Sequence, residues 1–204
     1  MSLQGTDAHR NADGTLPALV ARAVAAAHAH GFPYSCRPEQ GRLLRLLAAG
    51  APRGIAETGT GCGVGLAWLA SGAPPGTRLV SVERDAERVR VARQVFHGHQ
   101  GVEILHGDWP RVEEHGPYDL LVLDGGGQAK GDGAADPARL LTPGGTLVVD
   151  DFTPATTWPL DGVPDQARLH WLEHPALHAT ELRLAPDLSV VVGARPPGRD
   201  QWAE

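Results

Sequence analysis

Glycine occupies every second position from Gly59 to Gly65, directly after a short apolar run that ends on an acid, Glu57. Glycine allows positive φ angles and lets backbone N–H groups approach a ligand closely. Apolar residues resume at Val64, and a loop of this kind delivers its ligand to the start of a helix. The segment therefore predicts a strand, a cofactor loop and a helix. The predicted cofactor contacts are Glu57, Gly59, Thr60, Gly61 and Gly63.

Two cofactor classes compete for this loop, beside a purely conformational role for its glycines. A dinucleotide site reads G-x-G-x-x-G, and its third glycine allows close contact between helix and strand. If Gly59 and Gly61 are the first two, the third falls on Val64. The pattern is instead acid-x-G-x-G-x-G, in which the Glu57 carboxylate can receive an ammonium group. A NAD-linked oxidoreductase is thus disfavoured but stays open.

Further acids follow the ends of the other predicted strands. Glu83 ends the next strand, where a carboxylate can accept both ribose hydroxyls of a nucleoside, with a solvated surface acid as the alternative. The carboxyl ends of parallel strands meet at one edge of a sheet, so these acids would gather there. Their mutual repulsion would be costly unless cations, hydroxyls or ammonium groups occupied the site. The acids concerned are Glu57, Glu83, Asp108, Asp124, Asp150 and Asp151.

Strands that alternate with helices must position these acids. Strands are expected at 54–58, 78–83, 102–106, 118–124 and 146–150, and a terminal antiparallel hairpin at 180–184 and 188–194. Helices are expected at 16–30, 37–49, 85–99, 134–141 and 165–174. This order predicts a doubly wound α/β sheet that binds its ligand at the carboxyl ends of the strands.

Length and composition fit one domain. A chain of 204 residues with 42% hydrophobic residues can build a core without disulfides. The formal charge of −6 argues against nucleic acid and favours a small-molecule substrate. We expect a cytoplasmic protein with no membrane partner, since no signal peptide or long apolar run is present. Residues 1–14 are expected to be a disordered tail or an expression-vector remnant, and 15–204 the single domain, with N-terminal helices at 16–50.

Six motifs give a broader resemblance between Arg37 and Ala194: RPEQGRLLRLLA, ETGTGCG, VERD, HGD, YDLLVLDG and LLTPGGTLVVDD. Their order resembles that of the catechol-type O-methyltransferase-like family of class I S-adenosylmethionine (SAM) methyltransferases. The resemblance implies a Rossmann-like, seven-stranded, mostly parallel sheet with the antiparallel C-terminal hairpin. It also implies that Glu57 and the glycines hold the methionine moiety, Glu83 the ribose and Asp108 the adenine. The further predicted cofactor residues are Arg84, Gly107, Trp109 and Asp124.

The resemblance also implies a metal site. Many members bind a divalent cation through an aspartate that ends strand four and an acidic or amide pair that ends strand five, which correspond to Asp124, Asp150 and Asp151. Such hard oxygen ligands suit Mg²⁺. A metal there would lower the pKa of an acceptor hydroxyl and orient its oxygen toward the methyl group. The expected reaction is O-methyl transfer to a small hydroxylated molecule, with Mg²⁺ as a candidate cofactor.

The catalytic base departs from the family pattern. Gly127 stands where catechol-type members carry a lysine, and the histidine that related enzymes place after an Asp-Gly pair is also missing. Lys130, the only lysine in the chain, is a candidate base with a solvated loop lysine as the alternative. Without a metal, Asp150 or Asp151 is the candidate. A metal-independent methyltransferase, an inactive SAM binder and a NAD-linked oxidoreductase remain as alternatives, and the N-terminal helical extension is a candidate homodimer contact.

Overall fold

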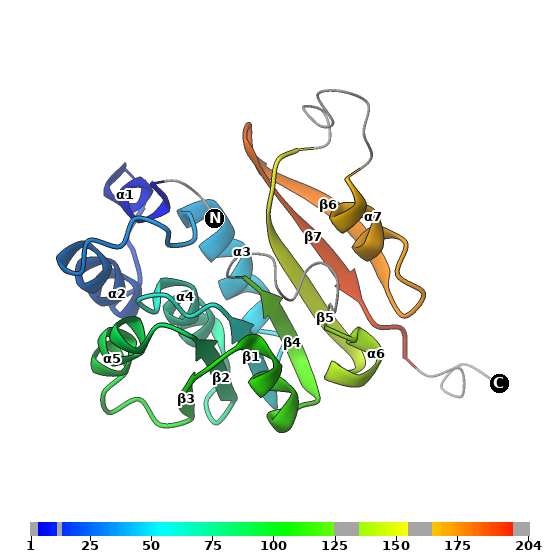
Figure 1. Cartoon of the computed structure of the whole chain (residues 1–204), viewed down its shortest axis with the longest axis horizontal. Coiled ribbons are helices and arrows are strands. Elements are labelled where there is room, and N and C mark those ends of the chain that lie inside the picture. The colour runs from blue at the N-terminus through cyan, green and yellow to red at the C-terminus, as the bar shows by residue number, and fades with distance from the viewer. Residues whose placement is uncertain (1–3, 12–13, 125–134, 155–164, 198–204) are drawn as a thin grey trace.

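The computed structural model describes residues 4–11, 14–124, 135–154 and 165–197, with the side chain of Asp151 outside this description. Its centre is a seven-stranded sheet in the order β3-β2-β1-β4-β5-β7-β6 (Figure 1). The strands are β1 Gly54–Thr58, β2 Arg78–Glu83, β3 Val102–His106, β4 Tyr118–Leu123, β5 Leu141–Phe152, β6 His178–Ala185 and β7 Leu188–Ala194.

The strand directions confirm the predicted fold class. Strands β1 to β5 pair in parallel, whereas β7 pairs antiparallel with both β5 and β6. The chain runs outward from β1 to β3 and then returns to place β4 on the other side of β1. The order of the strands therefore reverses between β1 and β4, where sheets of this type bind their ligands.

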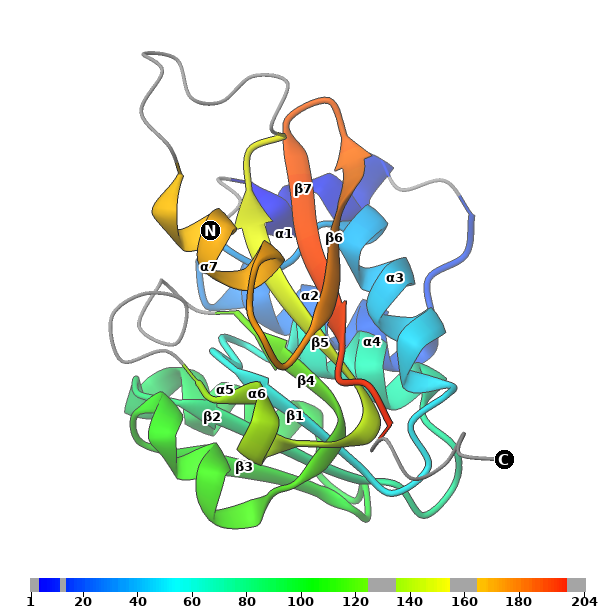
Figure 2. The same cartoon turned by 90° about the vertical axis from the view of Figure 1, so that its right-hand side faces the viewer.

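Helices cover both faces of the sheet (Figures 1 and 2). On one face, α2 to α5 bury Ile55, Leu120 and Val148. On the other, the 3₁₀ helix η2, α6 and α7 pack against the alternate strand residues, such as Ala56 and Leu121. A strand covered on both faces is largely apolar, as in β4, where Asp119 is the one charged residue. The helices are α2 Ala18–Ala29, α3 Pro38–Ala48, α4 Val64–Gly72, α5 Ala86–Val95, η2 Trp109–His115, α6 Pro137–Leu140 and α7 Gln166–Leu172.

The boundary between α6 and β5 differs from the prediction. Helix α6 is only four residues long, and β5 begins at Leu141 rather than at Thr146. The expected turn at Pro143, Gly144 and Gly145 lies within the strand as an irregularity, because the register between β4 and β5 shifts between Tyr118 and Leu120. Tertiary pairing has here overridden a local turn signal.

The expectation that residues 1–14 lie outside the fold is wrong for residues 5–11. Gly5–Ala8 forms the short helix α1 and His9–Asn11 a 3₁₀ turn. Thr6 and His9 are both buried, at 1% and 5% exposure. Their side chains hydrogen-bond to segments far along the chain, so a search for hydrophobic periodicity does not detect them. Within the described ranges, no helix combines the length and apolarity needed to cross a membrane.

Candidate cofactor site

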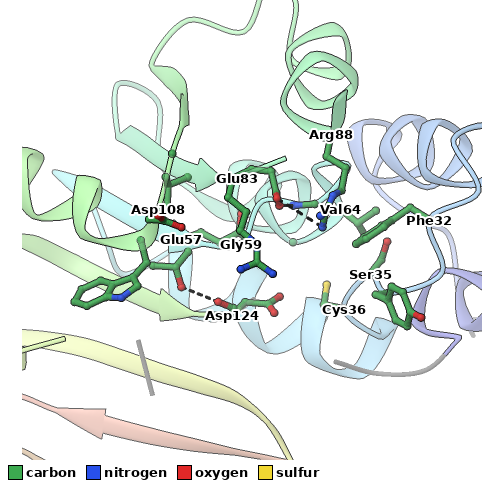
Figure 3. Close-up of a pocket in the computed structure, with 18 residues that line it drawn as sticks. Phe32, Ser35, Cys36, Glu57, Gly59, Val64, Glu83, Arg88, Asp108 and Asp124 are labelled. Carbon is green, nitrogen blue, oxygen red and sulfur yellow. Dashed lines mark hydrogen bonds and ion pairs between the residues drawn. The ribbon is translucent and has the colours of Figure 1, made fainter. Parts of the chain in front are cut away.

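A pocket lies at the carboxyl ends of β1, β2 and β4, at the predicted edge of the sheet (Figure 3). It brings together most of the predicted cofactor residues from four separate segments. Those that line it are Glu57, Gly59, Gly61, Glu83, Arg84, Gly107, Asp108, Trp109 and Asp124. Two predicted residues, Thr60 and Gly63, are not among the lining residues.

The glycine loop is attached to the neighbouring strand through its backbone. The N–H groups of Gly59 and Thr60 both donate to the carbonyl of Val82, at 2.8 and 3.1 Å. Gly61 has a φ of +54°, and a Cβ added there would lie 2.8 Å from Cε1 of Phe32. A side chain at this position would therefore be strained and would collide with the pocket wall.

Glu57 is the buried acid beneath the loop, with 1% of its surface exposed. The Ser81 hydroxyl donates to Oε2 of Glu57 at 2.8 Å, and the Thr60 hydroxyl lies 2.6 Å from Ser81 Oγ. Thr60 thus supports Glu57 from behind. Burial raises the pKa of Glu57 to about 8, aided by the nearby Asp150 and Glu83 charges and opposed by the Ser81 hydrogen bond. A cation bound beside Glu57 would favour its ionised form.

Glu83 is held by the backbone of the loop that it faces. Its Oε2 accepts from the N–H of Gly61, and its Oε1 from the N–H of Asp85, each at 2.9 Å. The Arg88 guanidinium lies 3.6 Å from Oε1. A carboxylate has about four acceptor positions, so these two hydrogen bonds leave capacity for the hydroxyls of a sugar.

Asp108, Trp109 and Asp124 complete the opposite side of the pocket. Asp108 precedes η2, and its side chain does not cap that helix. Asp124 follows β4, and its backbone carbonyl accepts from the Thr58 hydroxyl at 2.8 Å. Figure 3 shows Asp108, Asp124 and Glu57 among the residues that line the pocket.

One wall of the pocket is formed by residues that the sequence does not mark as a ligand site. Phe32, Tyr34, Ser35 and Cys36 line it from the segment between α2 and α3. The helix expected at 16–30 ends directly before this segment, and no local signal assigns the segment to a ligand. Burial, then the charges of Asp124, Glu57 and Asp150, raises the pKa of the Cys36 thiol, which makes it a poor nucleophile.

Gly65 and Arg88 were also missed. A Cβ on Gly65 would lie 2.3 Å from Oε1 of Glu57, so a side chain at that point of α4 would force the Glu57 carboxylate to move. The guanidinium of Arg88 lies 5.3 Å from the centre of the Phe32 ring. The repetition of glycine up to position 65 is the signal that points to Gly65. Nothing in the sequence points to Arg88.

The predicted metal ligands do not assemble among the residues that the structure describes. Asp150 is 2% exposed and is not a lining residue, and its Oδ2 accepts from Nε2 of Gln40 at 3.0 Å. No group of three His, Cys, Asp or Glu side chains suited to a metal occurs in the described part of the chain. The side chain of Asp151, and Gly127 and Lys130 entirely, lie outside the described residues.

Comparison with known proteins bears on the nature of this pocket. Residues 56–152 match a family model described as a methyltransferase domain. A provisionally named O-methyltransferase of Mycobacterium tuberculosis (strain H37Ra) is 34% identical over 120 residues, which cover 55% of this chain and 54% of that protein. A crystal structure of a cofactor-bound protein from MTB has 26% identity and a TM-score of 0.76, and the match covers 96% and 99% of the two chains.

The chain resembles methyltransferases over the residues that the family model covers. It spans about half the length of the curated relatives it matches. Two further solved structures share the methyltransferase fold. O-methyltransferase TomG from Streptomyces achromogenes, in complex with SAM, has 22% identity, a TM-score of 0.73 and coverage of 97% and 100%. The Bacillus cereus O-methyltransferase, in complex with S-adenosylhomocysteine (SAH), has 21% identity, a TM-score of 0.71 and coverage of 93% and 96%.

Proposed function

We propose that the protein is a SAM-dependent methyltransferase that transfers a methyl group to an oxygen of a small hydroxylated molecule. The observation that carries the proposal is the pairing of a buried Glu57 with a loop-held Glu83 across one glycine loop. Glu57 can bind a cation, and Glu83 can accept hydrogen bonds from hydroxyl groups. The glycine loop between them adds no side chains, so the two carboxylates suit the two ends of a nucleoside that carries an amino acid. The names of the relatives support oxygen as the acceptor atom.

The residues of the pocket would divide the cofactor between them. Glu57 would receive the ammonium group, Glu83 the ribose hydroxyls, and Asp108 the adenine amino group with Trp109 beside the ring. When bound, SAM supplies an electrophilic methyl group on a sulfonium. The acids also offset the positive charge of the bound cofactor, because opposite charges attract strongly where water is excluded. This arrangement fits SAM better than the NAD of the oxidoreductase alternative.

The chain must also orient the acceptor oxygen and remove its proton. Asp124 is the described carboxylate on the lining at the end of β4, which makes it the candidate to hold that proton. Orientation of two reacting groups supplies much of the rate in such a displacement. Asp150, Asp151 and Lys130 remain the other candidate bases.

Metal assistance is the finer part of the proposal. Asp124, Asp150 and Asp151 would hold Mg²⁺, and the Asp150 carboxylate has acceptor capacity beyond the hydrogen bond that its Oδ2 accepts from Gln40. We expect Mg²⁺ to change the heat of SAH binding or the rate of transfer if this site forms, and Asp151→Ala to abolish that change. If the rate of methyl transfer is the same with Mg²⁺ and with EDTA, the enzyme is metal-independent.

The first test is calorimetric titration with SAH. Glu83→Gln should weaken binding by about tenfold or more, because a neutral amide cannot replace the charge-assisted hydrogen bonds. Glu103→Gln, an exposed acid on β3, is the matched control and should bind as the unaltered protein does. No binding at millimolar SAH would overturn the proposal.

A second test separates the remaining alternatives. SAH formation from SAM is measured over a panel of hydroxylated and amine acceptors, and NADH binding is followed by its fluorescence. Turnover with a hydroxylated acceptor supports the proposal. SAH binding without turnover on any acceptor would favour the inactive SAM binder, and NADH binding would favour the oxidoreductase.

A further inference from the structure

The pocket wall at residues 32–36, which we call the strap, has no helix or strand of its own to fix it. Four of its residues line the cofactor pocket, and Figure 3 shows Phe32, Ser35 and Cys36 on the side opposite Asp108. Within the chain, the N–H of Phe32 donates to the carbonyl of Ala27 at 2.9 Å. The position of the strap must therefore depend on other contacts.

Thr6 of helix α1 supplies those contacts. Its N–H donates to the carbonyl of Pro33 at 3.1 Å, and its hydroxyl donates to the carbonyl of Phe32 at 2.7 Å. The hydroxyl oxygens of Thr6 and Ser35 lie 2.8 Å apart, and the N–H of Ser35 donates to Thr6 Oγ1 at 3.3 Å. The single Thr6 proton has two acceptors within reach, the Phe32 carbonyl and Ser35 Oγ, and Thr6 Oγ1 itself accepts from the N–H of Ser35. The Thr6 hydroxyl is therefore used both as a donor and as an acceptor.

A second attachment joins the 3₁₀ turn that follows α1 to the helix that follows the glycine loop. The indole N–H of Trp68, in α4, donates to Nε2 of His9 at 3.3 Å, and Nδ1 of His9 lies 3.0 Å from the carbonyl of Gly5. An indole nitrogen can only donate, so Nε2 carries no proton and Nδ1–H donates to Gly5. Both ring nitrogens of His9 are thereby used.

The strap in turn touches the groups assigned to the cofactor. Phe32 occupies the space that a side chain at Gly61 would need, and the Arg88 guanidinium lies between the Phe32 ring and Glu83. A shift of the strap would therefore disturb Gly61 and Arg88, both of which contact Glu83.

We propose that Thr6 is a positioning residue for the cofactor, which fixes the strap against the glycine loop. The proposal rests on the proposed function, because it takes SAM as the occupant of the pocket. Thr6 lies outside the pocket lining and acts through Phe32 and Ser35. A valine at position 6 would have nearly the same shape but would leave buried polar groups of the strap without partners.

The experiment compares Thr6→Val, Thr6→Ser and Thr15→Val by SAH titration well below their unfolding temperatures. Thr6→Val should weaken SAH binding by about tenfold, since each lost buried hydrogen bond costs on the order of one factor of ten. Thr6→Ser keeps the hydroxyl and should restore most of the affinity. Thr15 is exposed, so Thr15→Val should match the unaltered protein.

Affinity and stability separate positioning from a merely structural role. A structural role alone would lower the unfolding temperature of Thr6→Val but leave its SAH affinity within twofold of the unaltered protein, and that result would overturn the inference. If Thr6→Val fails to fold, His9→Phe loosens the same segment at its other attachment, and an unchanged affinity there overturns it equally. Failure of the unaltered protein to bind SAH would overturn the proposed function itself, together with this inference.

Discussion

The Ser81 hydroxyl donates a 2.8 Å hydrogen bond to Oε2 of Glu57, and both side chains are withdrawn from solvent. This bond favours the ionised carboxylate, yet the burial of Glu57 outweighs it, because the pKa is raised to about 8. The protein without a ligand therefore favours the protonated form of Glu57 at pH 7. A bound ammonium group would reverse that balance.

We predict that SAH binding at pH 7 releases a proton from Glu57. The released proton is measured by calorimetry in phosphate and in Tris, whose ionisation enthalpies differ. The affinity for SAH should also rise between pH 6 and pH 8, because the free protein then has less protonated Glu57 to ionise. Glu57→Gln should bind weakly and release no proton. Identical heats in both buffers for the unaltered protein would contradict the prediction.

Gly65→Ala should weaken SAH binding by about tenfold or more, because the new methyl group would lie 2.3 Å from Oε1 of Glu57 and force that carboxylate to move. Gly50→Ala is the control, since its nearest atom, the Leu47 carbonyl oxygen, lies at 3.6 Å. Titration of both variants with SAH decides the matter. Equal affinities would show that the pocket tolerates a side chain at position 65.

Arg168→Ala should lower the free energy of unfolding by about 3 kcal/mol, as expected when one partner of a buried ion pair is removed. Its Nη1 lies 2.5 Å from Oε2 of Glu181 and its Nε 3.3 Å from Oδ2 of Asp165, and its side chain is 6% exposed. It also donates to the carbonyl of Thr153.

The control for Arg168 is Arg139→Ala, which removes an exposed pair with Glu113 at the same 2.5 Å separation. Exposed pairs contribute about 1 kcal/mol or less. Chemical denaturation of both variants gives the comparison, and similar losses for the two would refute the distinction by burial.

His9 should make the N-terminal segment sensitive to acid. Burial lowers the pKa of His9 below its usual 6.5, with smaller opposing effects from hydrogen bonds to the backbone and from Glu39. The unfolded chain therefore takes up a proton first, so stability from this residue is present above pH 6.5 and is lost as the pH falls toward the lowered value.

Thermal unfolding between pH 7 and pH 5 tests this prediction. His9→Phe should remove part of the loss on acidification, whereas His178→Phe, at an exposed position on β6, should keep all of it. An unchanged pH dependence in His9→Phe would count against a neutral, buried imidazole.

The strands and the edge that bears the pocket were predictable because their signals are local. The nearly continuous apolar run of β4 and the acids at Glu57 and Glu83 occupy fixed places relative to a glycine loop, and a doubly wound sheet brings such places together. The catalytic assignments rest on the same reasoning but remain predictions, since Lys130 and the Asp151 side chain lie outside the described residues.

The strap and its attachment could not be predicted for a physical reason. Thr6 meets Ser35 across 29 residues, and Gln40 meets Asp150 across 110. Each contact is made by single polar side chains that follow no repeating pattern, so it cannot be predicted from composition or periodicity. Such contacts appear only when the fold has brought distant segments together.

The attachment of Thr6 decides how this protein should be handled at the bench. A purification tag, fluorophore or surface linker fused before Gly5 lies next to the segment that holds the strap. It can therefore disturb the cofactor pocket. Arg195 lies near the amino end of β5, away from the carboxyl ends of the strands that bear the pocket. Its backbone forms hydrogen bonds of 2.9 Å with Gly144 and Gly145 there. A label or surface attachment beyond Arg195 therefore lies away from the cofactor pocket. Binding assays are best designed with the attachment at that end of the chain.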